Sequence, residues 1–99
     1  MARITVLEVI AALESSRKTI RCEELRAFLI QLGFEIRDGK QGGHKVFFHG
    51  GLANFKSGSY NCGHGKNPEI KPAYVRKVVR ILDQYEQELT EFQGGLNND

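Results

Sequence analysis

At residues 42–49 the chain reads GGHKVFFH, a short run that predicts both a strand and a reactive side chain. The apolar residues predict a strand from about Lys45 to His49, which Gly50-Gly51 ends. The two glycines before His44 tolerate conformations that other residues avoid, so they can bring the backbone close to a ligand. Because an imidazole titrates near pH ~6.5, His44 is a candidate acid or base. A half-exposed structural histidine is the alternative interpretation.

Two further strands are expected around this one. Residues 34–37 alternate apolar and charged side chains, and Asp38-Gly39 after them is a strong turn signal. This pattern predicts a strand that pairs antiparallel with residues 45–49 across the loop 39–43. A third strand is expected near Ser57 to Cys62.

The sequence leaves open which face of the sheet is buried. Side chains alternate along a strand, so residues 44, 46 and 48 share one face and residues 45, 47 and 49 share the other. Since Val46, Phe47 and Phe48 are all apolar, either face can be the core. If His44 faces outward, Phe48 lies exposed beside it, where it can stack on a base or be covered by a partner.

Helical patterns frame the strands. Residues 5–8 read TVLE, the form of a capping box, and predict a helix from about Val6 to Leu13. An apolar stripe predicts a second helix over Cys22 to Leu32, which Gly33 ends. A third helix is expected from Pro72 to Leu89 as one continuous element.

These elements predict an α+β fold of two layers. Three antiparallel strands covered on one face by helices give an α-β-β-β-α core with an extra N-terminal helix, which is the layout of double-stranded-RNA-binding domains. The 99 residues have room for one domain, assigned to residues 1–92, and the polar residues 93–99 are expected to be a disordered tail. No apolar run approaches the ~20 residues of a membrane span and no signal-peptide pattern is present, so a cytoplasmic protein is expected.

Charge is segregated along the chain. Residues 35–80 carry nine basic and three acidic side chains, whereas residues 81–99 carry five acidic and no basic ones. The basic block predicts a phosphate-bearing partner, with a solvated face as the alternative. In the last helix, Arg76, Lys77 and Arg80 load the first half with cations, against the helix macrodipole, which indicates that they bind an anion there.

The cysteines and histidines give no metal pattern. Cys22 and Cys62 belong to no CxxC pair, so two buried free thiols are expected rather than a disulfide. Only Cys62 and His64 approach the ligand spacing of a zinc site, and no oxyanion-hole loop accompanies Cys62 as a nucleophile. We therefore expect no metal and no cofactor.

RNA cleavage needs few protein groups. RNA carries its own nucleophile, the 2′-OH, so one histidine acting as general base, with cations that hold the phosphate, can suffice. His44 is the candidate base, with Lys45 beside it and Lys40 across the loop.

Four segments, taken in order, resemble the HicA toxin family. They are RCEEL at 21–25, LGFEIR at 32–37, GHKVFFH at 43–49 and IKPAYVRKV at 70–78, and the resemblance extends over most of residues 5–85. It implies a fold like that of double-stranded-RNA-binding domains, metal-independent cleavage of mRNA by one histidine, and neutralisation by a cognate HicB antitoxin. The family's glycine-serine-histidine motif falls on residues 42–44, which implies that His44 is catalytic, and its lysine-proline falls on Lys71 and Pro72.

The chain departs from this family at two places. Gly43 stands where the family usually has serine, and the segment 58–67 is longer and richer in glycine, so no role is assigned to His64.

The expected function is that of a toxin endoribonuclease, with mRNA and a HicB-like antitoxin as partners. The alternatives are a non-catalytic RNA-binding module on the same fold and a protein-interaction domain. The expected catalytic residue is His44, and the expected RNA contacts are Lys40, Gly43, Lys45, Lys71, Arg76, Lys77 and Arg80.

Overall fold

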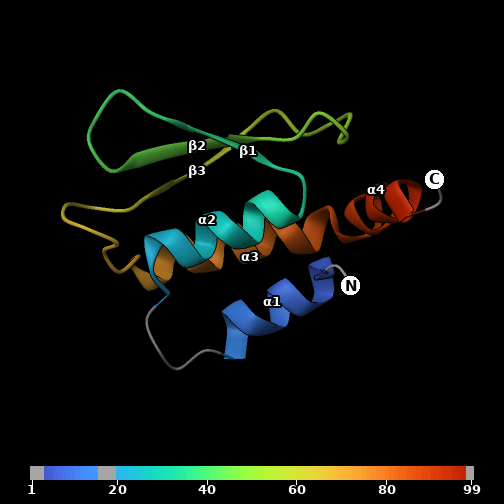
Figure 1. Cartoon of the computed structure of the whole chain (residues 1–99), viewed down its shortest axis with the longest axis horizontal. Coiled ribbons are helices and arrows are strands. Elements are labelled where there is room, and N and C mark those ends of the chain that lie inside the picture. Colours follow the sequence, from blue (N-terminus) through green and yellow to red (C-terminus); the bar gives the residue numbers. More distant parts are fainter. Residues whose placement is uncertain (1–3, 16–19, 98–99) are drawn as a thin grey trace.

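The computed structural model describes residues 4–15 and 20–97. In chain order the elements are α1 (Val6–Ser15), α2 (Cys22–Gln31), β1 (Glu35–Asp38), β2 (His44–Phe48), β3 (Gly58–Asn61), α3 (Pro72–Gln84) and α4 (Glu86–Asn97). The strands form one antiparallel sheet in the order β1-β2-β3. Helix α2 packs on β1 and α3 packs on β3, while α1 contacts α3 and α4 on the side away from the sheet (Figure 1). The predicted α+β class with three antiparallel strands is confirmed.

Burial in β2 decides which face of the sheet is the core. Phe47 is fully buried and His49 is 5% exposed, so their face is turned toward the helices. Phe47 packs against the rings of Phe34 and Phe55 at 5.4 and 5.8 Å. Because side chains alternate along the strand, residues 44, 46 and 48 lie on the opposite, outer face.

The expected starts of the helices are present. Thr5 N donates to Glu8 Oε1 at 3.0 Å and Glu8 N donates to Thr5 Oγ1 at 3.1 Å, which is the reciprocal pair of a capping box. Pro72 is the first residue of α3, where its missing N–H leaves no helical acceptor unpaired. Within the described residues, no helix is long and apolar enough to cross a membrane.

The C-terminal region differs from the expected single helix. Helix α3 ends at Gln84 because Tyr85 leaves the helical conformation, at φ −106° and ψ 16°. The Tyr85 ring packs on Phe55 at 5.3 Å, and its hydroxyl donates to the Asn54 carbonyl at 3.2 Å. These contacts fix the side chain against the β2–β3 connection at the point where the chain turns into α4.

Helix α4 occupies part of the segment expected to be disordered. It continues through Asn97, and Gln93 is buried, with Nε2 donating to the Ile4 carbonyl at 2.8 Å. Residues 93–97 are therefore helical in the structure, and the remainder of the expected tail, residues 98–99, lies outside the described residues.

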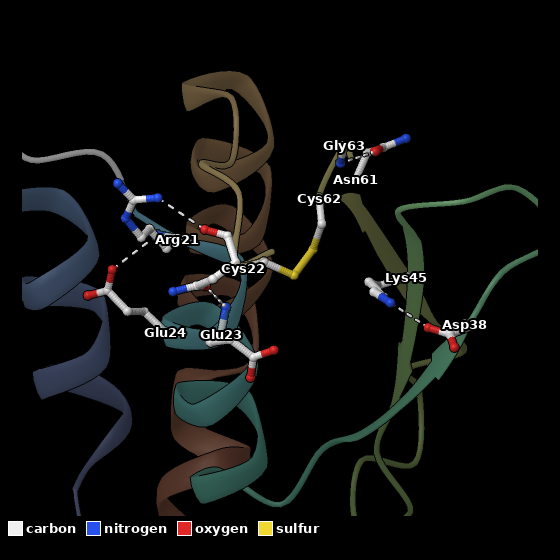
Figure 2. The surroundings of a disulfide bond; sticks show 10 residues. Arg21, Cys22, Glu23, Glu24, Asp38, Lys45, Asn61, Cys62 and Gly63 are labelled. Carbon is white, nitrogen blue, oxygen red and sulfur yellow. Dashed lines mark hydrogen bonds and ion pairs between the residues drawn. A yellow bond between two sulfur atoms is a disulfide. The ribbon is translucent and has the colours of Figure 1, made fainter. Parts of the chain in front are cut away.

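A disulfide joins Cys22 to Cys62, so the expectation of two free thiols is wrong. The two Cα atoms are 5.5 Å apart although the residues are separated by 40 positions in the sequence. Figure 2 shows the bond connecting the first residue of α2 to the residue that follows β3. Motif spacing could not reveal this pair, because the two cysteines meet only through the packing of α2 beneath the sheet.

The Tyr60 hydroxyl is buried and has no hydrogen-bond partner in the described part of the chain. Burial raises the pKa of Tyr60 to about 12, so the phenol is neutral at pH 7. An unpaired buried hydroxyl is costly, so we expect Tyr60→Phe to raise the free energy of unfolding by about 1 kcal/mol in urea denaturation.

The matched control for Tyr60→Phe is Tyr85→Phe. Its hydroxyl is hydrogen bonded, so the control is expected to lose about 0.5 to 1 kcal/mol. Because the pKa of Tyr60 rises from 10.0 to about 12 on folding, the unfolded state ionises first and stability falls as the pH rises through this window. Tyr60→Phe should reduce that alkaline loss. A clear decrease in stability at pH 7 would instead reveal a buried partner for the hydroxyl.

Candidate functional site

Two glycine-rich loops meet at one end of the sheet. The β1–β2 loop (residues 39–43) and the loop after β3 (residues 62–68) lie at the end where α2 and α3 begin (Figure 1). Cys62 N donates to the Gly43 carbonyl at 2.7 Å, and Gly39 N donates to the His44 carbonyl at 2.8 Å. The backbone around His44 is therefore held from both neighbouring strands.

Gly43 occupies a position that admits no side chain. Its φ is +83°, a left-handed conformation that L-residues rarely adopt, and an added Cβ would overlap the carbonyl oxygen of Gly63. The same Cβ would lie 2.8 Å from Gly63 N and 3.0 Å from Asn61 Oδ1. Glycine at this position thus has a structural reason: in this chain the two loops touch where a larger side chain would stand.

We expect Gly43→Ser to destabilise the protein. The left-handed backbone costs a non-glycine residue about 1 to 2 kcal/mol, and relief of the overlap must push the two loops apart. Chemical denaturation of the variant measures this loss. Gly50→Ser is the control, because a Cβ there meets nothing within 4 Å and the φ of Gly50 is not positive. Equal stability of the two variants would contradict the argument.

The His44 side chain lies on the outer face of the sheet and is half-buried. Its ring packs directly over Gly39, since a Cβ at that position would lie 2.9 Å from Cγ and 3.1 Å from Cε1 of the ring. The glycine therefore makes room for the imidazole, and the hairpin fixes where the ring lies. The question that the sequence left open is answered, because this histidine faces away from the helices.

Polar groups of β3 share this face with His44. Asn61 is the register partner of His44, and Ser59 is the partner of Val46. Lys77 reaches from α3 to the edge of β3, where Nζ donates to Ser59 Oγ at 3.4 Å. We call His44, Ser59, Asn61 and Lys77 the outer-face cluster.

Lys45 is not part of this cluster. It lies on the helix-facing side of β2, and its ammonium pairs with the Asp38 carboxylate (Figure 2). The hydrogen bond from Lys45 holds the pKa of Asp38 below its ordinary value, so the carboxylate stays ionised and the two charges neutralise each other. The lysine adjacent to His44 in sequence is therefore turned away from it in space.

The other predicted cations are divided between two places. Lys40 is exposed in the loop that leads to His44, at the same end of the sheet. Lys71 precedes α3, and Arg76 and Arg80 are exposed on that helix, in the layer beneath the sheet (Figure 1). Among the predicted cations, Lys77 is the one that a contact places on the outer face.

The argument from the helix macrodipole holds for α3 but not for the acidic residues that follow it. Glu86 and Glu88 belong to the first turn of α4, where the N-terminal dipole favours anions. They therefore do not oppose the dipole of α3. The unfavourable placement lies within α3, which has Arg76 and Lys77 in its first half, no acidic residue in its first turn, and Asp83 in its last turn.

His49 has a structural environment. Its ring lies between Phe34 and Phe92, with centroids at 4.7 and 4.6 Å. Gly51 N donates to Nδ1 at 3.0 Å, so Nε2 carries the proton and donates to the Leu32 carbonyl at 2.9 Å. Both ring nitrogens are therefore used within the fold, and His49 is no candidate for catalysis.

The remaining candidates for metal or nucleophile chemistry are also placed. Cys62 is consumed by the disulfide, so it offers neither a thiolate ligand nor a nucleophile. His64 is exposed in the loop after β3 and lies near the β1–β2 loop, since a Cβ at Gly42 would be 4.0 Å from its Cε1. Over residues 4–15 and 20–97, no group of three His, Cys, Asp or Glu side chains could hold a metal ion.

Ser59 and Asn61 were missed by the sequence interpretation. Their signal is present, because both alternate with Tyr60, which is 1% exposed, in the strand expected over 57–62. This alternation places Ser59 and Asn61 beside His44 only when the buried face of the sheet is known.

No protein-family model, curated protein or solved structure matches this chain. The resemblance to HicA toxins therefore depends on the residues quoted for it.

Proposed function

We propose that this protein is a toxin endoribonuclease that resembles the HicA family and cleaves mRNA with His44 as general base or acid, without a metal ion. The observation that carries the proposal is the position of His44. Its imidazole is half-buried on the outer face of the sheet, fixed over Gly39 and next to the outer-face cluster. A histidine that served only the core would lie on the other face, as His49 does.

The chemistry needs one proton acceptor and a cationic support. An unprotonated His44 would take the proton of a ribose 2′-OH while its oxygen attacks the adjacent phosphorus. The O2′–P bond forms and the P–O5′ bond breaks, which leaves a 2′,3′-cyclic phosphate. The departing O5′ takes up a proton from solvent, and the His44 imidazolium later releases its proton to solvent. The ammonium of Lys77, at the edge of the same face, would offset the charge that develops on the phosphate.

The order of the elements supports an RNA-directed role. Elements α2-β1-β2-β3-α3 follow the α-β-β-β-α order of double-stranded-RNA-binding domains, with α1 and α4 as additions. The helices occupy one face of the sheet and leave the outer face available (Figure 1). The excess of basic residues in this part of the chain would attract a polyanion.

The outer face also offers apolar surface to a protein partner. Val46 and Phe48 lie on it half-buried, and the Arg37 guanidinium sits 5.6 Å from the centroid of the Phe48 ring. A HicB-like antitoxin that covered this surface would block His44 at the same time. The proposed setting of toxin, antitoxin and mRNA is the cytoplasm.

Incubation of the purified protein with a long mRNA in EDTA tests the proposal. We expect discrete fragments that end in 2′,3′-cyclic phosphate, formed equally well with and without the chelator. Intact RNA at every protein concentration would overturn the proposal.

Filter binding at two salt concentrations separates the two rival functions. A non-catalytic RNA-binding module would hold RNA in a salt-dependent manner and leave it whole, whereas a protein-interaction domain would not hold it at all.

A further inference from the structure

We infer that the Asn61 carboxamide binds the phosphate that is cleaved, by donating from Nδ2 to one of its non-bridging oxygens. The inference depends on the proposed function and assigns a role to a residue that the sequence had not singled out. It starts from the pairing of Asn61 with His44 across β2 and β3.

The pairing brings the two side chains close together. The His44 carbonyl accepts its hydrogen bond from Gly39 on the β1 side, so His44 and Asn61 form a non-hydrogen-bonded pair of the β2–β3 ladder. Side chains approach most closely in such pairs, with Cβ atoms about 4.5 to 5.5 Å apart. Both side chains lie on the outer face, and neither lies in the core.

The orientation of the amide is fixed by the loop. Gly63 N donates to Asn61 Oδ1 at 2.7 Å, which identifies the oxygen and therefore also the nitrogen. Figure 2 shows Nδ2 on the side of the amide away from Gly63. In the part of the chain that the structure describes, Nδ2 donates to no protein acceptor, so both of its N–H groups are available to a ligand.

The neighbours of Asn61 suit a phosphate. The candidate base His44 lies on one side of Asn61. Ser59 lies two residues away along β3, and its hydroxyl accepts a hydrogen bond from the Lys77 ammonium. A phosphate over Asn61 would thus have a proton acceptor on one side and a cation on the other. Because Cys62, the next residue, is bonded to α2, the amide is held in place before a ligand arrives.

Asn61 also has a structural role, since its oxygen closes the turn at Gly63, and the test must separate the two. Asn61→Asp keeps an oxygen in the position that accepts from Gly63 N and removes the donor. We expect its thermal midpoint to stay close to that of the wild type, while kcat/KM for RNA cleavage falls by roughly 10²-fold. Asn54→Asp makes the same change of charge on an exposed loop at the other end of the sheet and should cleave like the wild type (Figure 1).

Sulfur substitution at the cleaved phosphate gives a readout that a structural role would not move. Sulfur is a poor hydrogen-bond acceptor, so the wild type should be slowed more by one phosphorothioate isomer than by the other. Asn61→Asp should lose this discrimination. Should that variant fail to fold, Asn61→Ser, whose hydroxyl can also accept from Gly63 N but reaches less far, takes the same measurement.

The outcomes distinguish this inference from the proposed function. Cleavage by Asn61→Asp at the wild-type rate, with the wild-type discrimination between isomers, would overturn the role of Asn61 and leave the endoribonuclease standing. Absence of cleavage by the wild type itself would overturn both.

Discussion

Reduction of the Cys22–Cys62 disulfide is expected to lower the free energy of unfolding by about 4 kcal/mol. The two cysteines are 40 residues apart in the sequence. A cross-link over a loop of that length lowers the conformational entropy of the unfolded chain, which stabilises the folded state by about 4 kcal/mol. Small domains are stabilised by only about 5 to 15 kcal/mol in total, so the effect is a large share of the whole. Guanidinium denaturation with and without a dithiol reductant, followed by circular dichroism, measures it.

The reduced protein is nevertheless expected to remain folded. Cys22 N still donates to the Pro68 carbonyl at 2.9 Å, and Ile70 N to the Ile20 carbonyl at 2.8 Å. Asn67 Oδ1 also accepts from Glu23 N at 2.9 Å. These bonds hold the loop after β3 to the start of α2 without help from the sulfur atoms.

A variant with both cysteines replaced by alanine is the control for reduction. It should resemble the reduced wild type in stability and should not respond to the reductant. An identical denaturation midpoint with and without reductant, once thiol labelling has shown that the bond was broken, would contradict the prediction. Disulfides are typical of oxidising compartments, whereas the proposed mRNA substrate is cytoplasmic, so activity should be compared in both redox forms.

Local signals in the sequence were sufficient for most of the secondary structure. The Thr5–Glu8 capping box, the glycine after α2 and the alternation before Asp38-Gly39 are interactions among neighbours in the chain, which is why they can be read without coordinates. The strand pairing followed from the short hairpin loop.

Features that depend on contacts distant in the sequence could not be predicted in this way. Asn67 contacts the first turn of α2 from 44 residues further along the chain, in a backbone conformation of φ 47°. Tyr85 ends α3 because of its contacts with the β2–β3 connection, although the helical pattern continues past it.

The candidate site was predictable only in part, for the same reason. The identity of His44 followed from local sequence and from the family resemblance, but the side chains around it depend on the face of the sheet that is buried. That face is set by Phe47 and its aromatic neighbours. Once it is known, Lys45 leaves the site and Asn61 joins it, while Lys77, already an expected RNA contact, lies at its edge.

Replacement of His44 by alanine is expected to abolish RNA cleavage with little change in stability. A positioned general base contributes roughly 10²- to 10⁴-fold to a rate. Any cleavage that remains in the variant should therefore be slower than that of the wild type by this factor. The half-buried ring lies on the outer face of the sheet over Gly39, away from the core, so its removal should shift the unfolding midpoint only slightly. Cleavage rates and thermal unfolding of the same preparation give both quantities.

His64→Ala is the matched control, because it removes an exposed imidazole from the neighbouring loop. We expect it to cleave RNA at a rate close to that of the wild type and, on expression in bacteria, to arrest growth as the wild type does. His44→Ala should permit growth. Retention of cleavage and growth arrest by His44→Ala would exclude this histidine as the catalyst. Loss of activity in both variants would instead show that cleavage needs both His44 and His64.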